Sequence, residues 1–137
     1  MSPEITEAEF VSYVSAATDS ELAALMADPD QRRTILDRIF ELWCAGIDTN
    51  KTRKVEAIIR WIIGTPPDTW DMHICRGACT AIHGPGGLRA DTTITVDDVA
   101  FLRVITRQAG GLQLLATGRM IVKGSMSTAL RMDGWFR

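Results

Sequence analysis

The sequence lacks a long apolar run, an excess of basic residues and a cysteine framework. Its 137 residues include 15 Lys or Arg and 17 Asp or Glu, so the net charge is −2 and no basic surface is expected to attract a nucleic acid. No apolar run approaches the ~18–20 residues that cross a bilayer. The 3 cysteines are an odd number, which does not suggest a disulfide scaffold. These absences exclude a nucleic-acid-binding protein, an integral membrane protein and a disulfide-stapled domain.

The first ten residues, MSPEITEAEF, lack the features of a secretion signal. They are acidic and polar, whereas such a signal begins with basic residues and continues with apolar ones. We therefore expect a cytoplasmic protein. In that reducing compartment the cysteines would stay as thiols.

The sequence does contain enough apolar material for one folded domain. Its hydrophobic fraction is 46% and its charged fraction 23%, as in ordinary globular proteins. The first 45 residues have helical spacing, with an apolar stripe at Phe10, Val11 and Val14 and a helix that starts near Pro29. We expect Gly46 to end that helix in a left-handed conformation.

The apolar spacing changes to about 2 residues after residue 54. Residues 55–64 are apolar at every second position, which predicts a strand. TWDMHIC and CTAIH predict a hairpin around Arg76-Gly77-Ala78, and TTITV and RMIVK predict two more strands. Helical spacing returns after each of these two strands, with Asp97 and Ser125 as the expected caps. The order of elements predicts an α+β fold.

Two C-terminal stretches carry a resemblance to a known family. ADTTITVDDVAFLRVI, at 90–105, joins a hydroxyl-rich strand to an acidic helix start. LQLLATGRMIVKGSMSTALRM, at 112–132, places a basic and apolar strand between Gly118 and Gly124. This pattern resembles the sterol carrier protein (type two) lipid-transfer domain, in a bacterial stand-alone form, over roughly residues 55–132.

That resemblance implies a five-stranded mixed sheet covered by helices. Residues 1–50 would then be an N-terminal helical extension, and residues 51–137 the lipid-binding domain of one globular unit. Between the sheet and the C-terminal helices the family has an apolar tunnel for fatty acids, acyl-CoA thioesters or sterols. Its members generally catalyse no reaction, so we expect a lipid ligand, no enzymatic activity and no cofactor.

The tunnel needs apolar side chains for a physical reason. Each methylene group that leaves water contributes about 0.8 kcal/mol, and methionine adapts its shape to different tails. Trp135 and Phe136 are expected to form a flap over the mouth. The residues expected to line the tunnel are Ile59, Trp61, Phe101, Leu102, Ile105, Leu112, Leu115, Met120, Val122, Met126, Leu130, Trp135 and Phe136.

Other interpretations of these residues stay open. Apolar residues at such spacings are also typical of an ordinary core. Trp61 is bulkier than the residue that many family members carry, and it would narrow or block the tunnel. In a second functional class the chain is an accessory or oligomerisation domain, whose apolar groove packs against a protein partner or a second copy in a homodimer.

A cluster of His and Cys residues raises the question of a metal site. His73, Cys75, Cys79 and His83 form the pattern H-x-C-x3-C-x3-H. We expect Cys75 and Cys79 to lie opposite each other on one face of the hairpin, with the four groups strung along it, whereas zinc requires ligands that converge in a tetrahedron. No G-x-S-x-G elbow is present either. We therefore predict neither a metal ligand nor a catalytic residue.

Overall fold

The computed structural model describes residues 5–84 and 86–136 and builds them around one five-stranded sheet. The strands are β1 (Glu56–Ile63), β2 (Asp68–Cys75), β3 (Ala78–His83), β4 (Thr92–Val96) and β5 (Met120–Gly124). They follow the order β3-β2-β1-β4-β5 across the sheet. β1 and β4 are parallel and the other neighbouring pairs antiparallel, so the sheet is mixed. The predicted α+β fold is confirmed.

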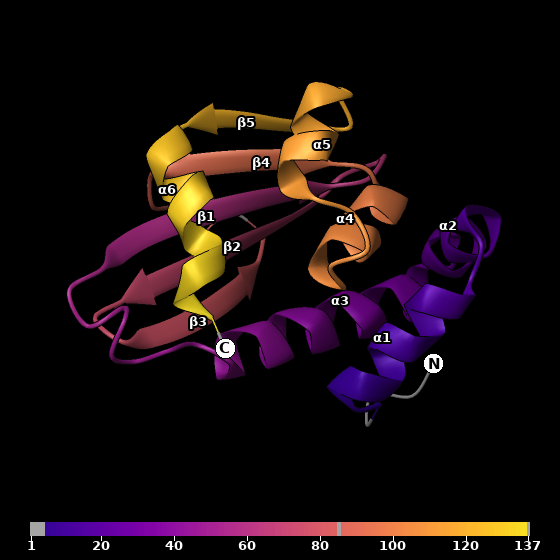
Figure 1. The fold of residues 1–137 in the computed structure, drawn as a ribbon, viewed down its shortest axis with the longest axis horizontal. Coiled ribbons are helices and arrows are strands. Elements are labelled where there is room, and N and C mark those ends of the chain that lie inside the picture. The colour runs from indigo at the N-terminus through magenta and orange to yellow at the C-terminus, as the bar shows by residue number, and fades with distance from the viewer. Residues whose placement is uncertain (1–4, 85, 137) are drawn as a thin grey trace.

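The helices lie on one side of this sheet, where the last four cover its face and the first two pack beside them (Figure 1). They are α1 (Glu7–Ala16), α2 (Asp19–Ala27), α3 (Pro29–Ala45), α4 (Asp98–Ile105), α5 (Gly111–Ala116) and α6 (Met126–Met132), followed by a 3-10 turn at Asp133–Trp135. Among the described residues, none of these helices has the length and apolar character needed to cross a membrane.

The alternation along β1 explains which face of the sheet is covered. Ala57, Ile59, Trp61 and Ile63 are buried, whereas the residues between them are exposed or half-buried. Successive side chains of a strand point to opposite faces, so the buried set faces the helices and forms the floor of the core.

Short polar side chains fix where two of the C-terminal helices begin. The carboxylate of Asp97 accepts a hydrogen bond of 2.7 Å from the amide of Ala100 at the start of α4. The hydroxyl of Ser125 accepts one of 3.1 Å from the amide of Thr128 at the start of α6. Each bond satisfies an amide that has no partner within the helix. The predicted caps at Asp97 and Ser125 are confirmed.

The end of α3 differs from the prediction. Gly46 follows the helix, but its φ is −84°, so the expected left-handed conformation is wrong. Its amide instead donates to the carbonyls of Leu42 and Trp43, at 3.1 and 3.0 Å. These bonds satisfy the last helical carbonyls without any reversal of the backbone.

The hairpin between β2 and β3 also differs from the prediction. Its turn contains only Arg76 and Gly77, with φ values of 48° and 89°, the geometry typical of a two-residue hairpin. Cys75 therefore pairs with Ala78, and Cys79 pairs with Ile74. The expectation that Cys75 and Cys79 lie opposite each other is wrong, because a shift of one residue in register moves a side chain to the other face.

Aromatic rings and one half-buried arginine join α3 to the rest of the molecule. The ring of Phe40 stacks on Trp70 of β2 with centroids 4.5 Å apart, and lies 5.9 Å from Phe101 of α4. Arg32 donates to Asp98 at 2.6 Å and also contacts Asp68, with only 14% of its side chain exposed. α3 is therefore an integral layer over the sheet.

Candidate functional site

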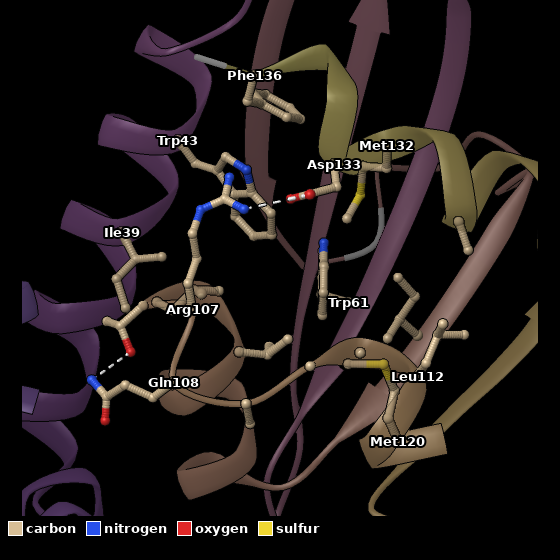
Figure 2. A pocket seen from close by; sticks show the side chains of 18 of the residues that line it. Ile39, Trp43, Trp61, Arg107, Gln108, Leu112, Met120, Met132, Asp133 and Phe136 are labelled. Atoms are coloured by element: carbon tan, nitrogen blue, oxygen red, sulfur yellow. Dashed lines mark hydrogen bonds and ion pairs between the residues drawn. The ribbon is translucent and has the colours of Figure 1, made fainter. Parts of the chain in front are cut away.

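A cavity of about 620 Å³ lies between the helices and the inner face of the sheet. Pockets for small molecules usually measure roughly 300–1,000 Å³. Figure 2 shows the side chains around it, which come from the sheet, from α3, from the segment after α4 and from the C-terminal residues. The cavity is therefore large enough for an organic ligand.

The sheet forms the first wall of the cavity. Trp61, Ile94 and Val122 line it and form one row across β1, β4 and β5, because Ile94 pairs with both of the others. Met120 lies two residues before Val122 on the same face and completes this wall. Strand alternation thus places four apolar side chains side by side.

α6 forms the second wall. Met126, Ala129, Leu130 and Asp133 line the cavity. They are spaced by three and four residues, the spacing that puts side chains on one face of a helix. Met126 opens the helix directly after the Ser125 cap, so the cap fixes which face of α6 meets the cavity.

The third wall comes from residues that were not predicted to bind the ligand. α3 contributes Ile39, Leu42 and Trp43, and α1 contributes Phe10 and Val11. Sequence reasoning assigned both helices to an extension outside the lipid-binding domain. The apolar side of α3 was visible in the sequence, but nothing in its spacing separates a side that covers a cavity from one that covers a core.

The loop between α4 and α5 borders the cavity on its solvent side. Residues 104–112 and Leu115 line it there. Trp61, at the inner end, is 2% exposed, whereas Leu112 is 71%, Leu130 59% and Met126 44% exposed. The cavity thus extends from the core to the surface, and its mouth is bordered by exposed apolar side chains.

The charged residues that line the cavity, Glu7, Arg107 and Asp133, are all exposed. Arg107 and Asp133 approach each other to 3.4 Å, with 69% and 78% of their side chains exposed. An ion pair so exposed is worth little. Figure 2 shows this pair on the same side of the cavity as Phe136 and Trp43.

One polar atom of a lining residue is enclosed by protein and does not open onto the cavity. The indole Nε1 of Trp61 is buried and has no hydrogen-bond partner among the described residues. The ring itself is well packed, with its centroid 5.3 Å from that of Trp43 and 5.4 Å from that of Phe101. Trp61 lines the cavity, and a volume of about 620 Å³ remains beside it.

Most of the residues predicted to bind the ligand lie around the cavity. Those that line it are Trp61, Ile105, Leu112, Leu115, Met120, Val122, Met126, Leu130 and Phe136. Ile59, Phe101 and Leu102 are fully buried beside it, at 0% exposure, and belong to the core. Their role in ligand binding stays a prediction that these positions alone do not test.

The two C-terminal aromatic residues have separate positions. Phe136 lines the cavity, with its ring 5.8 Å from that of Trp43. Trp135 is 6% exposed and does not line it. The carbonyl of Trp135 accepts a hydrogen bond of 2.8 Å from the amide of Asp48, which fixes this residue against the segment after α3.

The His and Cys residues of the hairpin do not converge. Cys79 and His83 are on the inner face, where the sulfur of Cys79 contacts Cys44 and the ring of His83 lies 4.9 Å from that of Trp70. His73 and Cys75 are on the outer face. The ligand atoms of His73, Cys75 and Glu56 lie within 4.8 Å of one another there, away from the cavity.

A comparison with protein families tests the family resemblance of the C-terminal stretches. Residues 36–137 match the model of the SCP-2 sterol transfer family. The chain belongs to this family. The SCP-2 match begins within α3 and so includes Ile39, Leu42 and Trp43, the part of that helix that lines the cavity.

Several solved structures share the fold of this chain. The sec-alkylsulfatase Pisa1 from Pseudomonas sp. superposes with a TM-score of 0.68 and 17% identity over 74% of this chain, which spans only 16% of the alkylsulfatase. Sterol carrier protein 2 like 2 from Aedes aegypti gives 0.59 and 20% identity, over 73% of this chain and 91% of that one. Its palmitated form gives 0.58 and 21%, over 72% and 86%.

Proposed function

We propose that the chain binds a lipid in this cavity and carries it without catalysing a reaction. The candidate ligands are a fatty acid, a fatty acyl-CoA or a sterol-like molecule. The observation that supports this function is the cavity of about 620 Å³, which has apolar walls on three sides and extends to the surface. Membership of the SCP-2 family and the palmitated relative favour the same ligand class.

Desolvation accounts for the affinity. Ten methylene groups transferred from water contribute about 8 kcal/mol, of which part is offset by the lost freedom of the ligand. The walls offer few polar contacts to a tail, so they bind hydrocarbon chains without selecting one particular lipid. Met120 and Met126 can adjust to tails of different shape, because their side chains are unbranched and polarizable.

Arg107 gives the mouth a cationic group for an acidic head. Its side chain lines the cavity and is 69% exposed, so a carboxylate or phosphate beside it keeps its contact with water. A buried carboxylate would lose that hydration at a large cost. The head group would therefore stay at the mouth while the tail enters towards Trp61.

Displacement of an environment-sensitive fatty-acid probe tests this function. Met126→Asp replaces an apolar side chain at the mouth with a hydrated carboxylate and is expected to weaken probe binding several-fold, because the apolar contacts of the methionine with the tail are lost and the bound tail would have to cover part of a charged group. Ser127→Asp is the matched control, because Ser127 is the next residue of α6, is exposed and does not line the cavity. Equal affinity of both variants and the unchanged protein would contradict lipid binding at this site.

A second candidate function rests on the exposed apolar border of the mouth. Leu112, Leu130 and Met126 are more exposed than apolar residues of a closed core, and such a patch is typical of a contact with another protein. In this alternative the chain is an accessory or oligomerisation domain and α6 packs against a partner or a second copy. Native mass spectrometry of the purified protein separates the two: a lipid adduct supports the carrier, and a dimer without lipid supports the interface.

A further inference from the structure

Three side chains with metal-binding atoms converge on the outer face of the sheet. Glu56 of β1 and Cys75 of β2 are directly opposite each other in the register of these strands, and His73 lies two residues before Cys75 on the same face. One carboxylate oxygen, one ring nitrogen and one sulfur of these residues all lie within 4.8 Å of one another. None of the three residues lines the cavity, so the cluster is separate from the proposed lipid site.

Backbone hydrogen bonds fix the two strands at this end of the sheet. The amide of Arg76, in the hairpin turn, donates to the carbonyl of Val55 at 2.8 Å, and the amide of Gly77 donates to the carbonyl of Thr52 at 3.1 Å. The turn that follows Cys75 is thus tied to the segment that precedes Glu56. The backbone of the cluster is therefore set before any ion binds, and less conformational freedom is lost on binding.

The surroundings of the cluster leave room for an ion. Within the part of the chain that the structure describes, no hydrogen bond or ion pair involves the side chain of Glu56, His73 or Cys75. Glu56 is exposed and the other two are half-buried, so solvent reaches the cluster. The residues of β3 opposite His73 and Cys75 are Thr80 and Ala78, which are short and exposed.

The donor atoms select the class of metal. A thiolate and an imidazole nitrogen suit zinc and similar transition-metal ions, whereas Ca²⁺ and Mg²⁺ take oxygen ligands. Ionised Glu56 and Cys75 together carry two negative charges, which balance a divalent ion. In a tetrahedral zinc site, bonds of about 2.0–2.3 Å place the ligand atoms about 3.3–3.6 Å apart. Small rotations of these side chains are enough to reach that spacing.

We propose that Glu56, His73 and Cys75 bind one zinc ion, with a water molecule in the fourth position of the tetrahedron. Three protein ligands and one water form the arrangement of zinc sites that stay open to a further group. The prediction of no metal ligand rested on the His and Cys residues alone, and Glu56, on another strand, supplies the third donor. The zinc site is independent of the proposed lipid binding.

Zinc binding to the chelator-treated protein tests this site. Competition with a chromogenic zinc chelator is expected to show one ion per chain. Cys75→Ser, His73→Gln and Glu56→Gln are each expected to weaken zinc affinity at least about tenfold, because even the loss of a group that only orients a ligand has an effect of this size. The affinity is expected to fall in acid, where protons compete with the ion for the same donors.

The chain offers matched controls for two of these variants. Cys79→Ser and His83→Gln replace a cysteine and a histidine of the inner face, and both are expected to keep the zinc affinity of the unchanged protein. Co²⁺ in place of zinc provides a second readout, the thiolate-to-cobalt charge-transfer band in the near ultraviolet. This band is expected in the unchanged protein and in Cys79→Ser, and is expected to be lost in Cys75→Ser.

The outcomes decide the site without reference to the cavity. If the unchanged protein takes up no zinc, or if Cys79→Ser weakens zinc binding as much as Cys75→Ser does, the proposed site is wrong. Should a ligand variant fail to fold, the cobalt band of Cys79→Ser decides, because its presence supports a Cys75 ligand and its absence overturns it. Binding of the fatty-acid probe is expected to be equal in Cys75→Ser and the unchanged protein, so failure of this site and failure of lipid binding are distinguishable.

Discussion

The Sγ atom of Cys44, in the last turn of α3, lies 2.6 Å from the Sγ atom of Cys79 on the edge strand β3. The hydrogen bond between the sulfurs lowers the pKa of Cys44. The same bond, together with burial, raises the pKa of Cys79. Because a thiolate is the reactive form of cysteine, we expect Cys44 to be the nucleophile of this pair.

Oxidised glutathione is expected to join these two residues. The thiolate of Cys44 attacks the glutathione disulfide and releases one reduced glutathione, and Cys79 then displaces the second from the mixed disulfide. The disulfide between α3 and β3 should raise the free energy of unfolding by about 3–4 kcal/mol, because it joins residues 35 positions apart and so closes a loop in the unfolded chain. Peptide mapping identifies the link, and urea unfolding measures its effect.

Two variants control the oxidation experiment. Cys75→Ser should form the same link, because Cys75 is on the outer face of the sheet, away from Cys44. Cys79→Ser should stop at the mixed disulfide on Cys44. A link that involves Cys75 in the unchanged protein would contradict the arrangement of the hairpin.

The stability of the fold is expected to fall in acid. Burial alone would raise the pKa of Asp71, but hydrogen bonds from Arg60, at 2.8 and 3.0 Å, and from the amide of Gly86, at 2.8 Å, outweigh it and lower that pKa. A carboxylate with a lowered pKa stabilises the fold above its unfolded value of about 4. This contribution is lost as the pH falls through the lower, folded value.

Asp71→Asn tests this pH dependence. It should lose about 2–3 kcal/mol near neutral pH, since the buried pair with Arg60 is broken, and its stability should decline less between about pH 5 and about pH 2. Asp37→Asn is the control, because Asp37 forms an exposed pair with Arg33 and is expected to change stability by less than about 0.5 kcal/mol. Urea unfolding across this range measures both, and parallel acid profiles of Asp71→Asn and the unchanged protein would contradict the prediction.

The two glycines that bound β5 differ in how closely they are packed. Gly124 has a φ of 87°, and a Cβ there would lie 2.5 Å from the carbonyl oxygen of Asp91. Gly118 has a φ of 76°, but nothing lies within 4 Å of its Cβ position. Gly124→Ala should therefore lower the free energy of unfolding by more than about 3 kcal/mol. Gly118→Ala should lower it by about 1 kcal/mol, through backbone strain alone. Thermal unfolding compares the pair, and equal losses would show that strain, not the clash, sets the cost.

The sequence predicted those features of the fold that depend on local chemistry. The alternation of residues 55–64 showed which side chains of β1 face the helices. Asp97 and Ser125 could be predicted as caps because a single short polar side chain can accept a hydrogen bond from a free amide at the start of a helix. The register of the hairpin was predicted wrongly. A turn of two residues and a turn of three shift the pairing by one position, and the amino-acid composition of the turn does not tell them apart.

The wall of the cavity was only partly predictable for another reason. Apolar periodicity tells which side of an element avoids water, and it gives the same signal when that side meets protein or empty space. Phe101 and Leu130 were both predicted to line the tunnel, although only Leu130 does. Trp43 was missed because the helix that carries it precedes the segment on which the family resemblance rested, and its contact with Trp61 forms only when α3 packs onto the sheet.

Phe101 and Leu130 give the sharpest separation of core from cavity. Phe101 is fully buried, does not line the cavity and lies 5.4 Å from the ring of Trp61, so Phe101→Ala should cost about 3–5 kcal/mol of unfolding free energy. Leu130 is 59% exposed at the mouth, so Leu130→Ala should change stability by less than about 1 kcal/mol yet weaken probe binding several-fold, because it removes apolar contacts with the ligand.

Urea unfolding and probe titration are measured on both variants, with Ile121→Ala as the control for an exposed apolar residue outside the cavity. If Leu130→Ala and Ile121→Ala bind the probe equally well, α6 does not contact the ligand, and the assignment of this wall fails even where the fold is intact.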